Sequence, residues 1–173
     1  MERLYLRELG TGPKEPMMAR NRASLTRIAL VATLVTGLTG LAPSLASGAT
    51  LTPRARLYRA TNNSRVNHDV RRVDIHWQIS KLARRHSIAM ANRGSIFHTS
   101  TSVIQGTYLD GINWSTWGEN VGITGGSVAD LQQAFMQSPG HRANILNQRF
   151  RRVALGTYRD DDGLLWVTVF FYG

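Results

Sequence analysis

The stretch RVALGTYRDDDGLLWVTVFFY, residues 152–172, decides the fold class. It contains two runs rich in β-branched and aromatic residues, Arg152–Tyr158 and Leu164–Tyr172. The segment between them ends in Asp162-Gly163, and an Asp-Gly pair is a strong signal for a hairpin turn. The three consecutive aspartates lack the alternating ligand spacing of a calcium loop, so a turn explains them more simply. The chain is therefore predicted to end in a β-hairpin.

Helical patterns precede the hairpin. Thr52-Pro53 is typical of an N-cap followed by a first helical residue. A second helix is predicted by an apolar face at helical spacing and ends at Gly94. Ser127 and Asp130 form the capping box of a third helix, and Ser138-Pro139 starts a short helical turn. The apolar face of the second helix consists of Ile79, Leu82, Ala83, His86, Ala89 and Met90.

Residues 95–124 show little periodicity and mix polar residues with aromatic ones. A loop of that length in a compact domain is usually functional or poorly ordered. Helices first and a hairpin last predict an α+β domain in which a sheet packs against helices.

The N-terminus has the pattern of an export signal. Three arginines precede an uncharged apolar stretch, residues 28–41, as in the n-region and h-region of a signal peptide. We expect cleavage after Ala46, which makes residues 1–46 a leader and residues 47–173 the exported domain. An uncleaved anchor is the alternative, but the stretch is shorter than the roughly 20 apolar residues that span a bilayer. Two internal methionines offer alternative starts, Met17 and Met18.

The composition narrows the classes of partner. The chain has 173 residues, no cysteine and a net charge of +10. Removing the leader takes away six basic and three acidic residues, which leaves a net charge of +7. The absence of cysteine excludes disulfides, a thiolate nucleophile and a lipidated cysteine. The arginines occur in scattered pairs without interleaved aromatic residues, so nucleic-acid binding is not favoured. A solvated, solubilising surface is the interpretation we favour.

Three polar residues in small or apolar surroundings are candidates for chemistry: His98, Glu119 and His141. Two imidazoles and a carboxylate suit either a metal site or an acid–base pair. The alternative is that each is a separately satisfied hydrogen-bonding residue, and spacing alone favours that alternative.

Two motifs resemble the bacterial branch of the CAP superfamily, which comprises the cysteine-rich secretory, antigen 5 and pathogenesis-related 1 proteins. The first motif is Gly118-Glu119-Asn120-Val121, and the second runs from Phe135-Met136 through Ser138-Pro139-Gly140-His141-Arg142 to Asn144-Ile145-Leu146. The resemblance covers nearly all of residues 47–173. Its other matching segments are Asn63-Ser64-Arg65, Ala83 with His86 and Met90, Phe97-His98, Phe150 with Val153, and Phe170-Phe171-Tyr172-Gly173.

The resemblance implies an α–β–α sandwich with a cleft of two histidines and two acidic residues, which in several members holds zinc or another divalent ion. By position, His98 and His141 match the histidines, and Glu119 matches one acid. Where the second acid is expected, this chain has Gln137 and Ser138. Three ligands still suffice for zinc, but the lost negative charge predicts weak, exchangeable binding at best.

The remaining motif residues are assigned structural roles. We expect Ser138 to be an N-cap, Gly140 to let the backbone pass close to the sheet, and Asn120 and Asn144 to bond the backbone. Arg142 is carried over as a motif residue without a further role. Ser138 as a nucleophile with His141 as its base is disfavoured, because no third orienting group is evident.

Three functions remain as hypotheses. The first, which we favour over catalysis, is a secreted, extracytoplasmic binding module for a small apolar ligand, a lipid or a cell-envelope component. Its ligand would contact the cleft and the loop 95–117, with apolar walls from Tyr108, Trp114 and Trp117. The second is a metal-dependent hydrolase or peptidase in which Glu119 is the base. The third is a domain with a vestigial cleft that binds another exported protein. Membrane association is expected only if the leader stays uncleaved.

Overall fold

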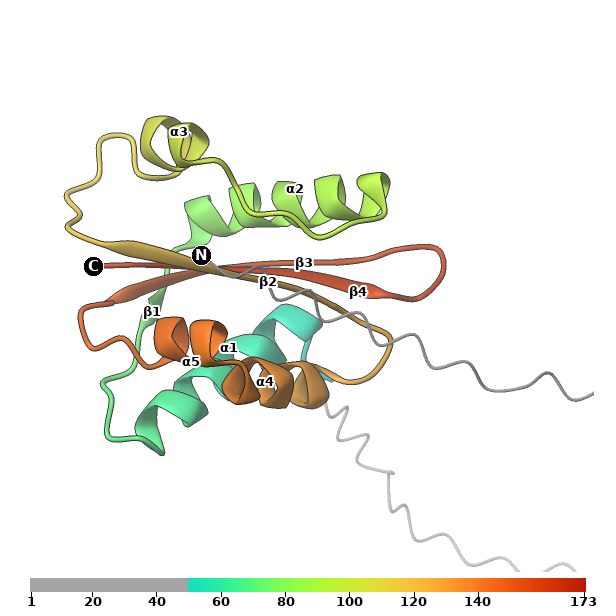
Figure 1. Cartoon of the computed structure of the whole chain (residues 1–173), viewed down its shortest axis with the longest axis horizontal. Coiled ribbons are helices and arrows are strands. Elements are labelled where there is room, and N and C mark those ends of the chain that lie inside the picture. The colour runs from blue at the N-terminus through green and yellow to red at the C-terminus, as the bar shows by residue number, and fades with distance from the viewer. Residues whose placement is uncertain (1–49) are drawn as a thin grey trace, which may run out of the picture. The chain divides into compact units, whose positions relative to one another are not determined.

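The computed structural model describes residues 50–173, and the expected leader, residues 1–46, lies outside them. Within the described residues, helices cover both faces of a four-stranded sheet, which gives three layers (Figure 1). The predicted α+β sandwich, with helices first and a hairpin last, is confirmed. None of the helices in this part of the chain has the length and apolar character needed to cross a membrane.

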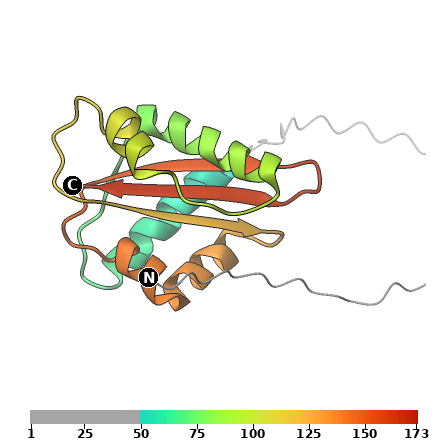
Figure 2. The same ribbon diagram turned by 45° about the horizontal axis from the view of Figure 1, so that its top comes forward.

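The sheet has the strand order β1-β3-β4-β2. The predicted hairpin is β3–β4, and its turn is stabilised by Asp160, whose Oδ1 accepts from the Leu164 backbone N–H at 2.8 Å. Strand β2 is antiparallel to β4 and forms one edge of the sheet, between the two helical layers (Figure 2). The strands are β1 (Asp74–Ile75), β2 (Trp117–Thr124), β3 (Arg152–Arg159) and β4 (Leu165–Tyr172).

The helices divide between the two faces. Helices α2 and α3 lie on one side of the sheet, and α1, α4 and α5 lie on the other (Figure 1). The ranges are α1 (Pro53–Val66), α2 (Trp77–Arg93), α3 (Thr101–Val103), the π-helical turn η1 (Ile104–Tyr108), α4 (Val128–Gln137) and α5 (Pro139–Ile145).

Local signals set the helix ends. The Thr52 hydroxyl caps α1, Gly94 ends α2 with a φ of 65°, and Ser127 and Asp130 form a complete capping box on α4. These ends are as predicted. The cap of α2 was not predicted: it is His76, whose Nδ1 accepts from the Ile79 backbone N–H at 3.2 Å.

Residues 95–124 are more ordered than the sequence predicts. They contain α3, η1 and the edge strand β2, so the prediction of an irregular loop is wrong. The strand escaped detection because its first half carries Gly118-Glu119-Asn120 instead of alternating apolar residues. All three are buried, and their polar groups are satisfied within the fold.

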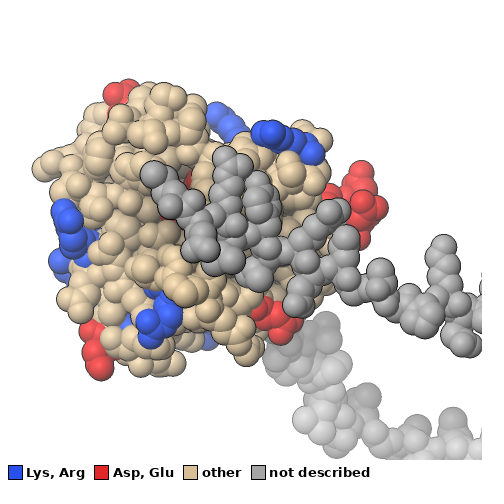
Figure 3. Space-filling view, viewed as in Figure 1, with Lys and Arg blue, Asp and Glu red and all other residues tan. Residues whose placement is uncertain are grey.

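The core lies on both faces of β4, all of whose residues are buried. Phe171 packs towards α1, α4 and α5, while Phe170 packs towards α2 and η1. Burying a phenylalanine side chain contributes roughly 1.5–3 kcal/mol. On β3, Gly156 admits α2 unusually close, because an added Cβ would lie 2.1 Å from the backbone carbon of Ala83. At the outer end of β3–β4, acidic side chains gather at the turn (Figure 3).

Candidate functional site

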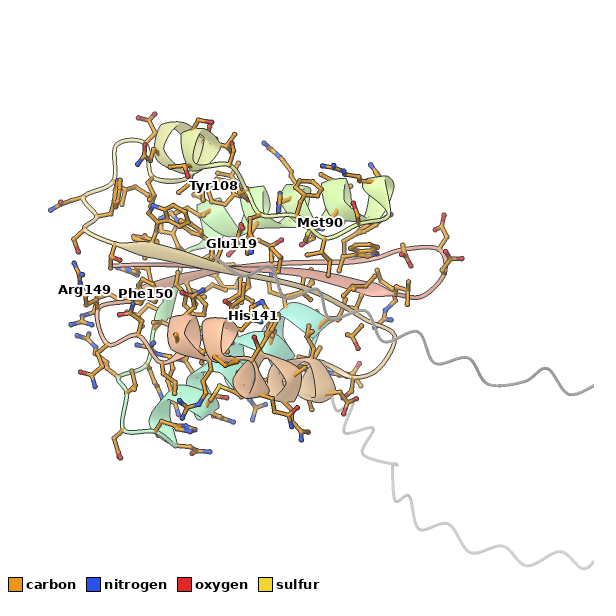
Figure 4. All side chains as sticks on the ribbon, in the orientation of Figure 1. Met90, Tyr108, Glu119, His141, Arg149 and Phe150 are labelled. Carbon is orange, nitrogen blue, oxygen red and sulfur yellow. The ribbon has the colours of Figure 1, made fainter. Side chains whose placement is uncertain are left out.

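The candidate site is built around β2. Successive side chains of a strand point to opposite faces, so Glu119 faces the side of α2, while its neighbours Gly118 and Asn120 face α5. Figure 4 shows Glu119 and His141 on the two sides of β2. The structure joins two of the three candidates, since Glu119 bonds His98 directly, whereas the side chain of His141 contacts Ser138 on α5.

Glu119 is a buried carboxylate with three donors. It is 5% exposed. Its Oε2 accepts from His98 Nδ1 at 3.0 Å and from the Thr99 backbone N–H at 2.9 Å, and its Oε1 accepts from the Thr99 hydroxyl at 2.7 Å. Burial acts to raise the pKa of Glu119, but the bonds from His98 and Thr99 outweigh it and hold the pKa below the ordinary value. The carboxylate is therefore ionised and engaged on both oxygens.

His98 forms the outer half of this pair. Its side chain is 63% exposed, whereas that of Glu119 is 2% exposed. The hydrogen bond to Glu119 raises the pKa of His98, against the opposing effect of burial. The imidazolium is thus accessible to solvent, whereas its carboxylate partner is not.

His141 has a different environment on α5. Its Nδ1 lies 2.9 Å from the Ser138 hydroxyl, and its ring packs against Phe135 at a centroid distance of 4.9 Å. Burial lowers the pKa of His141, and the positive charge of His98 lowers it further. Ser138 occupies the N-cap position of α5, but its hydroxyl contacts the imidazole and makes no cap bond. Among the described residues, no side-chain hydrogen bond orients His141 Nε2.

The two motif asparagines join α5 to β2. Asn120 Nδ2 donates to the His141 carbonyl at 3.0 Å, and Asn144 Nδ2 donates to Asn120 Oδ1 at 2.9 Å and to the Glu119 carbonyl at 3.2 Å. Gly118 makes room for this junction, because an added Cβ would lie 2.5 Å from Asn144 Oδ1. The Gly-Glu-Asn motif therefore links the edge strand β2 to the segment after α2 on one face of the sheet and to α5 on the other.

Two other motif residues lie outside this junction. Gly140 does not pass close to the sheet as expected: an added Cβ would have no neighbour within 4 Å, so that expectation is wrong. The residue sits in the exposed first turn of α5, where the helix faces outward. Arg142 on the same helix is also exposed.

The family resemblance implies a divalent ion, but these residues do not fit one. Both oxygens of Glu119 already accept hydrogen bonds from His98 and Thr99, so the carboxylate would have to give up these bonds to bind an ion. In residues 50–173, no three His, Cys, Asp or Glu side chains come together so that they could hold a metal ion. The donor groups of these residues therefore support no metal-dependent step at this site.

A groove of about 410 Å³ lies beside α2, with Tyr108 in its lining; we call it the α2 groove. Its apolar lining comes from Ile79, Leu82, Tyr108 and Ile112, and its polar lining from His76, Gln78, Lys81, Arg85, Thr107 and Asp110. Burial, with a smaller contribution from the Glu119 charge, raises the pKa of Tyr108 to about 12. Tyr108 is therefore a neutral side chain in the lining of the groove.

Of the three aromatic residues expected to contact a ligand, only Tyr108 lines the α2 groove. Trp114 and Trp117 are half-buried and pack against the core cluster of Ile79 and Phe170. Sequence reasoning missed the lining from α2, since Ile79 and Leu82 were assigned to an ordinary buried helix face. Only the position of η1 in the folded structure shows that part of this face of α2 lines a groove and is not fully covered.

Comparison with known proteins identifies the family and the fold. The model of the cysteine-rich secretory protein family, CAP, matches residues 58–171. The uncharacterized protein YkwD of Bacillus subtilis (strain 168) is 29% identical over 120 residues, which are 66% of this chain and 45% of YkwD. This chain thus spans less than half the length of that relative.

Solved structures agree. An extracellular protein containing an SCP domain from Bacillus anthracis str. Ames is 26% identical, with a TM-score of 0.58 over 69% of this chain and 40% of that one. An outer surface protein of Borrelia burgdorferi shares the fold at 16% identity, with a TM-score of 0.60 over 69% of this chain and 91% of that protein. The segment that matches the family model includes both motifs around β2 and α5. The chain therefore belongs to the CAP, or cysteine-rich secretory protein, family.

Proposed function

We propose that this chain is an extracytoplasmic binding module, and that its ligand is an amphiphile with an apolar body and an anionic group. The observation that carries the proposal is the α2 groove, whose volume of about 410 Å³ suits a small molecule. Its location outside the cytoplasm is supported by the solved relatives, which are described as extracellular or outer-surface proteins.

The lining of the groove supports this ligand class. Ile79, Leu82 and Ile112 provide an apolar floor, against which hydrocarbon is removed from water. Lys81 and Arg85 are exposed and lie one helical turn apart on α2, so both can reach an anionic group at the rim. A guanidinium and an ammonium bind carboxylate and phosphate oxygens through charge-assisted hydrogen bonds.

The residues around β2 support binding over hydrolysis. A general base must be free to take a proton from water or substrate, whereas Glu119 is buried and accepts hydrogen bonds on both oxygens. The lowered pKa of Glu119 also makes it a weak base. We therefore propose no catalytic step for this site.

The test measures oleate binding to the full chain by titration calorimetry, in wild type and in Lys81→Gln/Arg85→Gln. The variant should bind oleate at least about tenfold more weakly, because hydrogen bonds to charged groups contribute roughly 1.5–3 kcal/mol each. Binding of oleyl alcohol, which has the same chain without the charge, should change little.

The matched control is Arg56→Gln/Arg59→Gln on α1, which removes the same charge from exposed residues outside the groove. Equal losses in the two double variants, or no saturable binding of either probe to wild type, would contradict the proposal.

A further inference from the structure

Five exposed arginines meet at the end of the sheet where β1 and β3 begin. They come from two segments that are far apart in sequence, and all five are solvent-exposed. We call this set the basic end: Arg71, Arg72, Arg149, Arg151 and Arg152. In the sequence they look like scattered pairs, and only the fold makes them neighbours.

A buried arginine holds the two segments together. Arg65 on α1 is 0% exposed and donates to the Arg71 carbonyl at 2.7 Å, the Asn147 carbonyl at 3.0 Å and the Phe150 carbonyl at 3.3 Å. The Asp74 backbone N–H donates to the Arg151 carbonyl at 3.0 Å, and Asp74 is the register partner of Arg152. The two segments are thus fixed side by side before any ligand arrives.

None of the five arginines of the basic end forms an ion pair within residues 50–173, although Arg151 donates hydrogen bonds to the Gln148 and Phe150 carbonyls. The one ion pair among these residues is His98–Glu119. Three of the arginines elsewhere on the domain stack on aromatic rings: Arg54 on Trp77, Arg84 on Tyr158 and Arg93 on Phe97. The two segments, residues 69–74 and 147–152, also carry Asp69 and Asp74. Their five arginines and two aspartates therefore give a net charge of three positive. Like charges held this close repel one another, and bound anions relieve that repulsion.

The opposite end of the same strands is acidic. The β3–β4 turn carries Asp160, Asp161 and Asp162 beside Arg159, so its net charge is two negative, and Figure 3 shows a cluster of acidic groups at this end. Figure 4 places Arg149 at the basic end. The eight residues of β3 separate the two ends by roughly 25 Å at about 3.3 Å per residue. The two ends of the β3–β4 hairpin therefore carry net charges of opposite sign.

We propose that the basic end docks on an anionic phospholipid surface, with the β3–β4 turn directed away from it. An anionic plane attracts the basic end and repels the acidic turn, so it favours one orientation of the hairpin, whereas a flexible polyanion does not impose such an orientation. Arginine binds phosphate groups in a bidentate manner. Nucleic acid is disfavoured, because the aromatic Phe150 in these segments is 1% exposed and cannot stack on bases.

The experiment measures sedimentation of the full chain with vesicles of phosphatidylglycerol or phosphatidylcholine. The test variant is Arg72→Gln/Arg149→Gln, and the matched control is Arg56→Gln/Arg59→Gln; the leader is the same in all. The partition coefficient on phosphatidylglycerol should fall roughly 30-fold in the test variant, since each arginine near an anionic surface contributes roughly a factor of five. The control should change less than about threefold, and added salt should remove the difference.

Equal losses in the two variants would overturn the proposal, because net charge alone would then explain binding. Equal binding of wild type to both lipids would overturn it too. Tighter binding to polyphosphate than to vesicles at equal phosphate concentration would overturn the proposal as well, because the ligand of the basic end would then be a linear polyanion and not a lipid surface. Near-ultraviolet circular dichroism checks that the test variant is folded; if it is not, Arg149→Gln/Arg152→Gln replaces it. Oleate binding should be unchanged in the test variant, which separates this site from the α2 groove.

Discussion

The residues around β2 and those of the α2 groove differ in how their polar groups are satisfied. Around β2, Glu119, Asn120 and Asn144 have their hydrogen-bonding groups engaged inside the protein. In the groove, Lys81 and Arg85 face solvent beside an apolar floor. The family motif therefore stabilises the edge strand, whereas the polar groups that are free to bind a ligand belong to the α2 groove.

The largest effect that tests this contrast is expected from Glu119→Ala. The substitution removes the acceptor of three hydrogen bonds and leaves the Thr99 N–H and hydroxyl without it. We expect the free energy of unfolding in urea to fall by about 3 kcal/mol, since a hydrogen bond to a charged group contributes roughly 1.5–3 kcal/mol. Oleate affinity of the folded protein should stay within about threefold. A fully stable variant that loses oleate binding would reverse the assignment of the two regions.

A smaller effect is expected on the other side of β2. Asn144→Ala removes one donor to Asn120 Oδ1 and to the Glu119 carbonyl, and it should lower the free energy of unfolding by about 1–2 kcal/mol. Gln137→Ala on the exposed end of α4 is the control and should be nearly neutral. Thermal unfolding of both variants measures the difference. Equal stability of the two would mean that the α5 junction does not hold β2.

Much of the fold follows from the sequence because its signals are local. The Asp-Gly turn, the Ser127 and Asp130 capping box and Gly94 each fix an element end through contacts within a few residues. Strand β2 was missed because its polar motif is satisfied by partners about 20 residues away or more, at Asn144 and Thr99. Residue spacing carries no information on such partners.

The candidate site shows the same limit. The family resemblance predicts that His98, Glu119 and His141 share one cleft, but which nitrogen faces which oxygen depends on the packing of α5 and of the segment after α2. The groove depends on where η1 settles over Ile79 and Leu82, and the basic end depends on the contacts of Arg65. These features are long-range, so an apolar pattern or a pair of arginines alone does not reveal them.

The smallest effect is expected in the pH dependence of the stability that the His98–Glu119 pair contributes. The pKa of His98 is raised in the folded protein, so its contribution to stability is present below its ordinary value of about 6.5 and is lost as pH rises through the folded value. The pKa of Glu119 is lowered, so its contribution is present above its ordinary value of about 4.5 and is lost as pH falls through the folded value. The pair therefore stabilises the fold most between about pH 4.5 and 6.5.

His98→Gln isolates this contribution. The difference in free energy of unfolding between wild type and variant should be greatest in that window and shrink above it. It should stay below about 1 kcal/mol, because solvent screens an imidazolium that is 63% exposed. His141→Gln is the matched control, since the pKa of His141 is lowered and its contribution is instead lost as pH falls from about 6.5. Urea titrations at a series of pH values measure both, and a His98→Gln difference that grows above pH 7 would show that the raised pKa of His98 does not stabilise the fold.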